Sequence, residues 1–377
     1  MIKRIAMILI IILLLTPVRC KAYDEAETNK TIDDYTYKVE SALDDAIDDD
    51  TEEALGEYGI TADDPLSAGS VNIGDVLSGL ISGFKSSLTE PLKLFGKLIA
   101  VCAFTSLVKS TAQKSSIGDI YDTAGVLVTV LVIADCLSAA IEGVKSSLND
   151  ISLFMSSYIP IFSSVLASNA SISSAAGYYS VMIILSEIIV FISKSVLLPL
   201  SGAVMALCIV GAINGSSNIS GLSMSVRNFT KWVLTALMTV FTAVISIKGI
   251  TGAAADSVAS RTIRFAASSF IPIVGGSVSE AYSTIYGSLG VIRSGVGVIG
   301  IAAVAVIALK PILYVAALKL IIVLSSAVND LFGQSGSSAL LKGINDVLSV
   351  SLGIITAMSM IFIISTAMIL MTSMNIV

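Results

Sequence analysis

The chain has 377 residues, of which 55% are hydrophobic and 13% charged, and its mean hydropathy is +0.90. Soluble domains carry roughly 25% charged residues, so a soluble fold could not bury this much apolar surface. The net charge of −6 is uneven: residues 23–65 hold sixteen acidic residues and two lysines, whereas the chain beyond residue 65 holds sixteen basic and twelve acidic residues. No basic patch typical of nucleic-acid binding occurs.

Several kinds of catalytic site are excluded by residues that the chain lacks. It has no histidine, which excludes Ser-His-Asp and Cys-His catalysis and histidine zinc sites. The absence of a GxxxxGK(S/T) motif excludes a P-loop ATPase. The four cysteines Cys20, Cys102, Cys136 and Cys208 are far apart and form neither a CxxC motif nor a disulfide framework. We therefore expect no enzyme, no cofactor and no metal site.

The N-terminus has the features of an export signal. Lys3 and Arg4 precede an apolar run over 5–15, and Pro17 ends that run before it reaches a spanning length. We predict a cleavable signal peptide over 1–22, with an uncleaved anchor helix as the alternative. In both cases the acidic arm over 23–70 lies outside the cytoplasm.

Two amphipathic helices are predicted before the first long apolar run. In the arm, Ile32, Tyr35, Val39, Leu43 and Ile47 recur every three or four residues and form one apolar stripe. This stripe favours docking against protein, and the alternative is a solvated, partly disordered arm. The second helix, over 71–90, suits a position in the membrane interface.

The remainder, 91–377, is predicted to be a multi-span membrane domain. Crossing about 30 Å of hydrocarbon takes about 20 helical residues. Apolar stretches of at least that length cover 92–112, 123–144, 178–214, 229–250, 294–328 and 349–374. The third and fifth are long enough for two short spans or one broken helix. We therefore expect an all-α polytopic integral membrane protein with six to eight transmembrane helices.

An internal repeat is visible in this domain. The segment around Pro160 matches that around Pro272, and Pro199 matches Pro311, both at an offset of 112 residues. Proline removes a backbone donor, so equally placed prolines predict helix breaks at corresponding positions of duplicated units. The units would cover about 119–218 and 231–330, followed by the final helix 349–374. A parallel and an inverted repeat are both open.

Gly295, Gly297 and Gly300 satisfy the GxGxxG spacing of dinucleotide-binding turns. The motif opens a long apolar run, and Lys319 stands where an acidic residue is expected. Close packing of helices through small residues is therefore the favoured interpretation.

Ionisable residues inside apolar runs are candidate pathway or assembly residues, because a charge at mid-membrane costs about 2.5–3.5 kcal/mol. They are Asp135, Glu187, Lys194, Lys310 and Lys319. Glu187 and Lys194 lie two turns apart on one helix face. The alternative is that the lysines extend to the membrane interfaces and the acids bond to neighbouring helices.

The stretch 248–300 resembles the stage III sporulation protein AE family of endospore-forming Firmicutes. The resemblance rests on Lys248, Gly249, Asp256, Arg261, Thr262, Phe270, Pro272, Gly275, Gly276, Gly287 and Gly297. The order of signal, acidic segment, multi-span core and final apolar helix is also similar. The arm carries no motif of that family.

This resemblance implies a multi-pass protein of the mother-cell membrane around the forespore, within a channel or secretion-like complex required after engulfment. Its partners would be the other stage III sporulation A-operon proteins, including an ATPase, and the forespore stage II sporulation protein Q. A stand-alone secondary transporter of a small solute is the alternative. A pore within one chain and a pore between the copies of a homo-oligomer both fit the sequence.

Overall fold

The computed structural model describes residues 25–57, 59–61, 73–111, 118–168, 171–214, 218–270 and 275–374. Helices make up nearly all of these ranges, and no β-strand occurs in them. In chain order the helices are α2 (Glu25–Asp44), α3 (Asp49–Gly56), α4 (Ile73–Ser87), α5 (Thr89–Thr111), α6 (Gly118–Ser168), α7 (Ile172–Ile192), the π-helical turn η2 (Ser193–Leu197), α8 (Leu198–Asn214), α9 (Asn218–Phe270), α10 (Gly275–Leu331) and α11 (Ser335–Met374).

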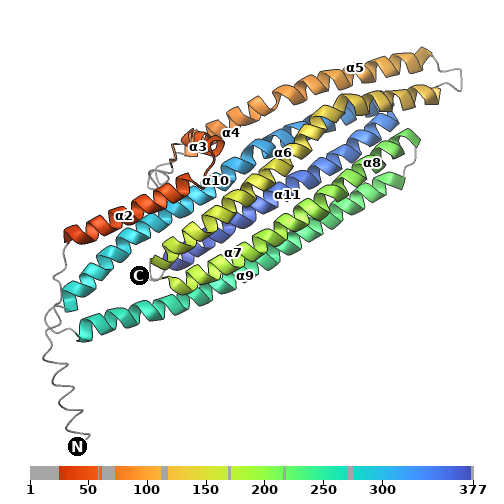
Figure 1. The fold of residues 1–377 in the computed structure, drawn as a ribbon. Helices are drawn as coiled ribbons and strands as arrows, with labels where there is room; N and C mark the ends of the chain where they lie inside the picture. Colours follow the sequence, from red (N-terminus) through yellow and green to blue (C-terminus); the bar gives the residue numbers. More distant parts are fainter. Residues whose placement is uncertain are drawn as a thin grey trace, which may run out of the picture.

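The long helices lie side by side in an elongated bundle, and successive rods run in opposite directions (Figure 1). α7, η2 and α8 together form one rod. α11 contacts α6, α8, α9 and α10. It is the most buried of the long helices because neighbours surround it. The turn between α10 and α11 is tight: Gly333 has φ of 68°, a conformation that glycine adopts without a Cβ penalty.

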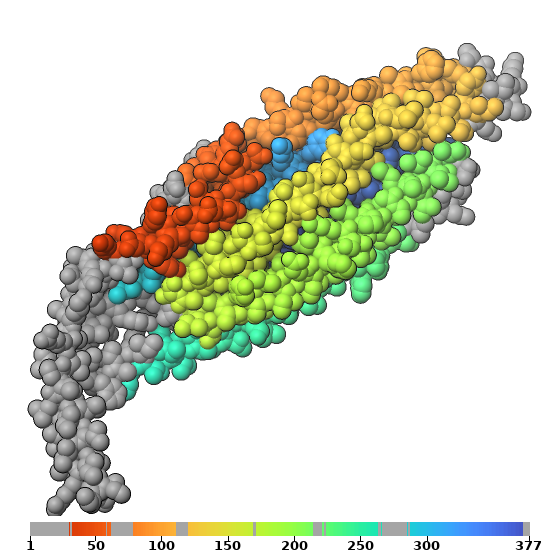
Figure 2. Space-filling view, in the orientation of Figure 1, coloured from red at the N-terminus to blue at the C-terminus, as the bar shows by residue number. Residues whose placement is uncertain are grey.

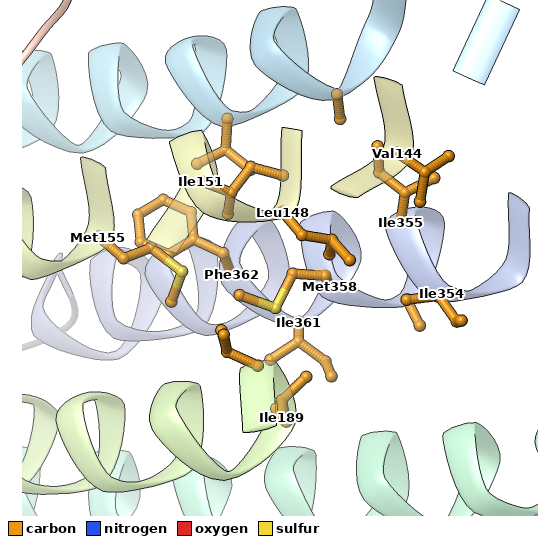
Figure 3. Close-up of a cluster of buried hydrophobic side chains, with 14 of the residues drawn as sticks. Val144, Leu148, Ile151, Met155, Ile189, Ile354, Ile355, Met358, Ile361 and Phe362 are labelled. Carbon is orange, nitrogen blue, oxygen red and sulfur yellow. The ribbon is translucent and has the colours of Figure 1, made fainter. Parts of the chain in front are cut away.

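The core between α6, α7 and α11 is apolar along its length (Figure 3). Figure 3 labels Val144, Leu148, Ile151 and Met155 of α6, Ile189 of α7, and Ile354, Ile355, Met358, Ile361 and Phe362 of α11. Nearer the α6 C-terminus the core is aromatic. The rings of Phe154, Tyr158 and Phe162 stack with centroids 5.3 and 5.5 Å apart. Aromatic pairs at this spacing add to the stability given by burial alone.

Glycines of the GxGxxG motif let helices approach closely. A Cβ at Gly297 would clash with Leu370 of α11, and one at Gly300 would overlap the ring of Tyr158 on α6. The Tyr158 hydroxyl donates a hydrogen bond to the carbonyl of Val296 at 3.0 Å. Close helix packing through small residues, predicted from the sequence, is therefore confirmed.

The acidic arm docks on the chain's own core. α2 packs against α6 and α10, and α3 packs against α10. Val39, Leu43 and Ile47 of the predicted stripe are buried, while Ile32 and Tyr35 are partly buried against the same core. Tyr35 and Ser168 hydroxyls are 2.8 Å apart. Figure 2 shows this segment on the outer surface of the bundle.

Six stretches are long and apolar enough to cross a membrane. They are Ser78–Ser110, Ile120–Ser168, Ile172–Ile213, Met224–Thr262, Gly287–Leu331 and Ser335–Met371. The protein is thus an all-α, multi-pass membrane protein, and its described residues contain six candidate spans, within the predicted six to eight. The first stretch joins part of α4 to α5, and the predicted amphipathic segment 71–90 contains α4.

The predicted proline breaks are only partly seen. α6 continues through Pro160 and α10 continues through Pro311. One proline removes one helical hydrogen bond, and the packing of a long helix holds the remaining turns in place. Pro199 differs: it follows η2, in which the Leu198 N–H bonds to the Ser193 carbonyl. Pro272 lies outside the described residues.

The two predicted repeat units hold similar pairs of rods. The first contains α6 followed by α7, η2 and α8, and the second contains most of α9 and α10. Because each unit contains two antiparallel rods, it begins and ends at the same end of the bundle. The second unit therefore starts in the same direction as the first, and duplicated units would form a parallel repeat. The repeat itself stays a prediction.

Candidate functional site: charged side chains between the long helices

The best-formed charged contact between long helices joins α9 to α11. Arg227 Nη1 lies 2.7 Å from Asp346 Oδ1, and the two side chains are 27% and 20% exposed. Both residues belong to candidate membrane spans. Neither is among the residues predicted from the sequence, because Arg227 precedes its apolar run and Asp346 ends a polar stretch of α11.

Lys319 of α10 reaches the same part of α11. Its Nζ donates a hydrogen bond to Ser349 Oγ, and Ser349 Oγ donates to the Asn345 carbonyl at 2.7 Å. We call Arg227, Lys319, Asn345, Asp346 and Ser349 the polar cluster. It brings two cations and one carboxylate to the meeting point of three helices.

The polar cluster is not fully satisfied. Arg227 Nε and Asn345 Oδ1 are buried without a hydrogen-bond partner. Buried polar atoms without partners are uncommon in folded proteins and indicate a strained or functional position. The cavity beside the cluster does not admit a water-sized sphere. It lies between α8, α9 and α11 and is lined by Ser201, Val204, Val226, Arg227, Asp346, Val347 and Val350. The cluster is thus closed in this conformation.

Lys194 forms a second contact between helices, and it lies within the π-helical turn η2. Its Nζ donates a hydrogen bond to Asn149 Oδ1 on α6. Proline at 199 cannot donate to the carbonyl four residues earlier, and the wider turn adjusts the backbone ahead of it. π-Turns occur frequently at functional sites. Ser193, in the same turn, is buried and its hydroxyl has no partner.

Asp135, Glu187 and Lys310 are exposed on the outer surface of the bundle. No ion pair joins any of them to another charged group within the described ranges. The structure therefore brings Lys319 and Lys194 into contacts between helices, and leaves the other three candidates facing outward. Glu187 and Lys194 do not form a pair.

Asp256, one of the residues on which the family resemblance rests, lies at the contact of α9 with the start of α7. Asp256 is 2% exposed, and its two carboxylate oxygens accept hydrogen bonds from the backbone N–H groups of Ser173 and Ser174 at 2.9 and 3.0 Å. Gly252, one turn earlier, allows this approach because a Cβ there would lie 2.9 Å from Ser174 Cα. Asp256 thus caps the N-terminus of α7 from another helix. The N-cap residue of α7, Ser171, makes no capping hydrogen bond with its own side chain.

The other motif residues have different surroundings. Gly249 is buried, and Lys248 and Arg261 are exposed. Gly275 and Gly276 begin α10, whereas Pro272 and the side chain of Phe270 are outside the described part of the structure. In that described part, no three His, Cys, Asp or Glu side chains gather as metal ligands, and Cys102, Cys136 and Cys208 are free thiols.

Comparison with known proteins identifies the family. A family model described as stage III sporulation protein AE matches residues 62–373. The chain belongs to the stage III sporulation protein AE family. The match covers the whole long-helix bundle, including the polar cluster and the Asp256 contact, and excludes α2 and α3.

A relative from Bacillus subtilis (strain 168), stage III sporulation protein AE, is 26% identical over 239 residues. The aligned part is 63% of this chain and 60% of the relative, so the alignment spans less than two thirds of that protein. No solved structure matches the chain.

Proposed function

We propose that this protein is the membrane-embedded subunit of a channel or secretion-like complex that joins the mother cell to the forespore and is required for endospore development after engulfment. Membership of the stage III sporulation protein AE family over residues 62–373 carries the proposal. The six long apolar helices suit a subunit that is built into a membrane.

The partners would be the other stage III sporulation A-operon proteins, including an ATPase, and the forespore stage II sporulation protein Q. The chain contains no P-loop, so a partner would supply any ATP hydrolysis. The outward faces of its helices carry large apolar side chains, including Phe104, Leu131, Trp232 and Ile250. Such faces suit lipid or the helices of neighbouring subunits.

The proposed location is the mother-cell membrane around the forespore, with the arm on the extracytoplasmic side. An even number of crossings returns the chain to its starting side, so the end of α11 would share the side of the arm. Reporter fusions after residues 65, 116 and 374 test this topology. An export-dependent reporter that is active at 116 and silent at 65 and 374 would show that the orientation is opposite to the proposed one.

Association is the decisive test of complex membership. Protein solubilised from sporulating cells should co-purify with the other operon products, and its loss should stop forespore development after engulfment. The double variant Glu187→Gln/Lys194→Met should weaken sporulation and leave membrane insertion intact. A protein that always purifies alone, while the other products assemble without it, would refute the proposal.

A stand-alone secondary transporter is the second candidate. The observation in its favour is the polar cluster with the nearby π-helical turn, since ionisable side chains between membrane helices mark solute and ion pathways. Its test is uptake of solutes by liposomes that contain only this purified chain. Transport without partners, abolished by Lys319→Met, would favour this candidate over the channel subunit.

A further inference from the structure

A polar groove lies between α7 and α9, at the end of the bundle where α7 begins. It has a volume of about 350 Å³ and is open to the outside. Its lining includes Ser173, Gly177, Ser180, Lys248, Thr251 and Gly252. Gly177 leaves room for the stem of Lys248, which runs over it, and Gly252 lets α9 approach α7 beside the groove.

The groove offers a cation and several hydroxyl groups. Lys248 is exposed, and no carboxylate of the described residues pairs with it. The nearest acid on its own helix face, Asp256, is already bonded to two backbone N–H groups. Ser174, next to the lining residue Ser173, packs against Gly252 and does not line the groove. The Ser180 and Thr251 hydroxyls donate to the main-chain carbonyls of Gly177 and Ile247, so the Lys248 ammonium is the donor that suits a phosphate here.

The positions of charges along α7 and α9 place this groove at one membrane interface. α7 has 21 residues without a charge other than Glu187, and measures about 31 Å. Beyond its far end stands Lys194. On α9, Lys248 and Lys231 are seventeen residues apart, or about 26 Å, and Trp232 adjoins Lys231. Both lengths are close to the roughly 30 Å of a hydrocarbon core bounded by Lys and Trp.

The side chains that flank the groove are apolar and exposed. They include Ile172 and Tyr179 on α7 and Ile247 and Ile250 on α9. The acidic arm packs on the other side of the bundle, against α6 and α10, and Figure 1 shows α2 and α9 along opposite edges. Among the described elements, the arm thus leaves the α7–α9 side uncovered, where acyl chains could pack.

From these observations we propose that the groove between α7 and α9 binds the phosphate headgroup of an anionic phospholipid, with Lys248 as the charged ligand and the acyl chains along Ile247 and Ile250. Free phosphate esters share the headgroup chemistry, but they would gain nothing from the apolar flanks. The site is independent of the partner complex, so the purified chain is sufficient to test it.

The experiment measures lipid retained by the full chain after release from nanodiscs that contain equal amounts of phosphatidylglycerol and phosphatidylcholine, using native mass spectrometry. The wild-type protein should retain phosphatidylglycerol preferentially. Lys248→Met should lower that retention by about fivefold, the value of one lysine near an anionic surface. Gly177→Leu should lower it comparably by filling the groove while keeping the lysine. Lys231→Met, an exposed lysine on the same helix, is the matched control and should retain the wild-type level.

Helix content and elution volume of each variant establish that it is folded. The proposal is overturned if folded Lys248→Met and Gly177→Leu both retain phosphatidylglycerol as the wild type does, or if phosphatidylcholine is retained equally. It is also overturned if millimolar glycerol phosphate displaces the lipid, because the site would then serve a soluble phosphate ester. Each result leaves membership of the sporulation complex to be judged by co-purification.

Discussion

Arg227 on α9 and Asp346 on α11 form an ion pair with 2.7 Å between Nη1 and Oδ1, although 119 positions separate them in the chain. Lys319 approaches the same segment of α11 through Ser349. Three consecutive helices are thus held together at one level of the bundle by polar contacts between residues 119 and 30 positions apart.

Asp346→Asn should lower the free energy of unfolding by about 1–3 kcal/mol, because Arg227 keeps its charge and loses its counter-ion. Denaturation in mixed detergent measures the change. Asp330→Asn is the control: the Asp330–Lys342 pair is 48% and 60% exposed, and exposed pairs contribute about 0–1 kcal/mol. Equal effects of the two substitutions would show that the Arg227 pair has no special role.

Asp256→Ala should destabilise the start of α7 by about 1–3 kcal/mol, since two backbone N–H groups lose a charged acceptor. The amides of Ser173 and Ser174 should then exchange hydrogen faster, which mass spectrometry can follow. Asp135→Ala removes an exposed helical carboxylate and should change stability by no more than about 0.5 kcal/mol. Unchanged exchange at Ser173 and Ser174 would contradict the capping role of Asp256.

Gly300→Ala should destabilise the contact of α10 with α6 by about 1–3 kcal/mol, because the new methyl group overlaps the Tyr158 ring. Gly287→Ala, on the same helix, meets no atom within 4 Å. It should raise stability by up to about 1 kcal/mol through helix propensity. The unfolding temperature should fall in Gly300→Ala and rise in Gly287→Ala. An unchanged unfolding temperature in Gly300→Ala would argue against close packing there.

Leu43→Ala should loosen the arm, since Leu43 is fully buried under α2. Truncating a buried leucine costs about 2–5 kcal/mol. This cost is large compared with the free energy that the small docked surface of the arm can contribute. Limited proteolysis should cut the variant within 25–57 faster than the wild type and leave the long helices intact. Tyr37→Ala, at a position 72% exposed, should not change the cleavage rate.

Periodicity predicted the features that depend on local sequence. The stripe of Val39, Leu43 and Ile47 is the buried face of the arm, and the glycine spacing at Gly297 and Gly300 marks a close helix contact. Both depend on residues three or four positions apart, which a helix places on one face. The chain's own core as the partner of the stripe was not predicted, because α6 and α10 are far away in sequence.

Charge in an apolar run identified Lys194 and Lys319 among the contacts between helices, but it did not identify the Arg227–Asp346 pair. Asp135 and Lys310 lie in apolar runs yet face outward, since a long helix exposes one side along much of its length. Arg227 and Asp346 lie in polar stretches and pair only through the tertiary fold. Prolines were also weak evidence for breaks: α6 and α10 continue through Pro160 and Pro311 because neighbouring helices pack along each of them. Of these three prolines, only Pro199 follows a change in the hydrogen-bonding pattern.

The lengths of α6, α9 and α10 have a consequence for how the protein meets its surroundings. At 51, 53 and 57 residues they extend about 77–86 Å, whereas the hydrocarbon layer is about 30 Å thick. A helix of this length that crosses the layer once and upright has more of its length outside the lipid than within it. Such rods would continue beyond the bilayer as a helical stalk, so a chain whose described part contains no separate globular domain would still present an extended protein surface there.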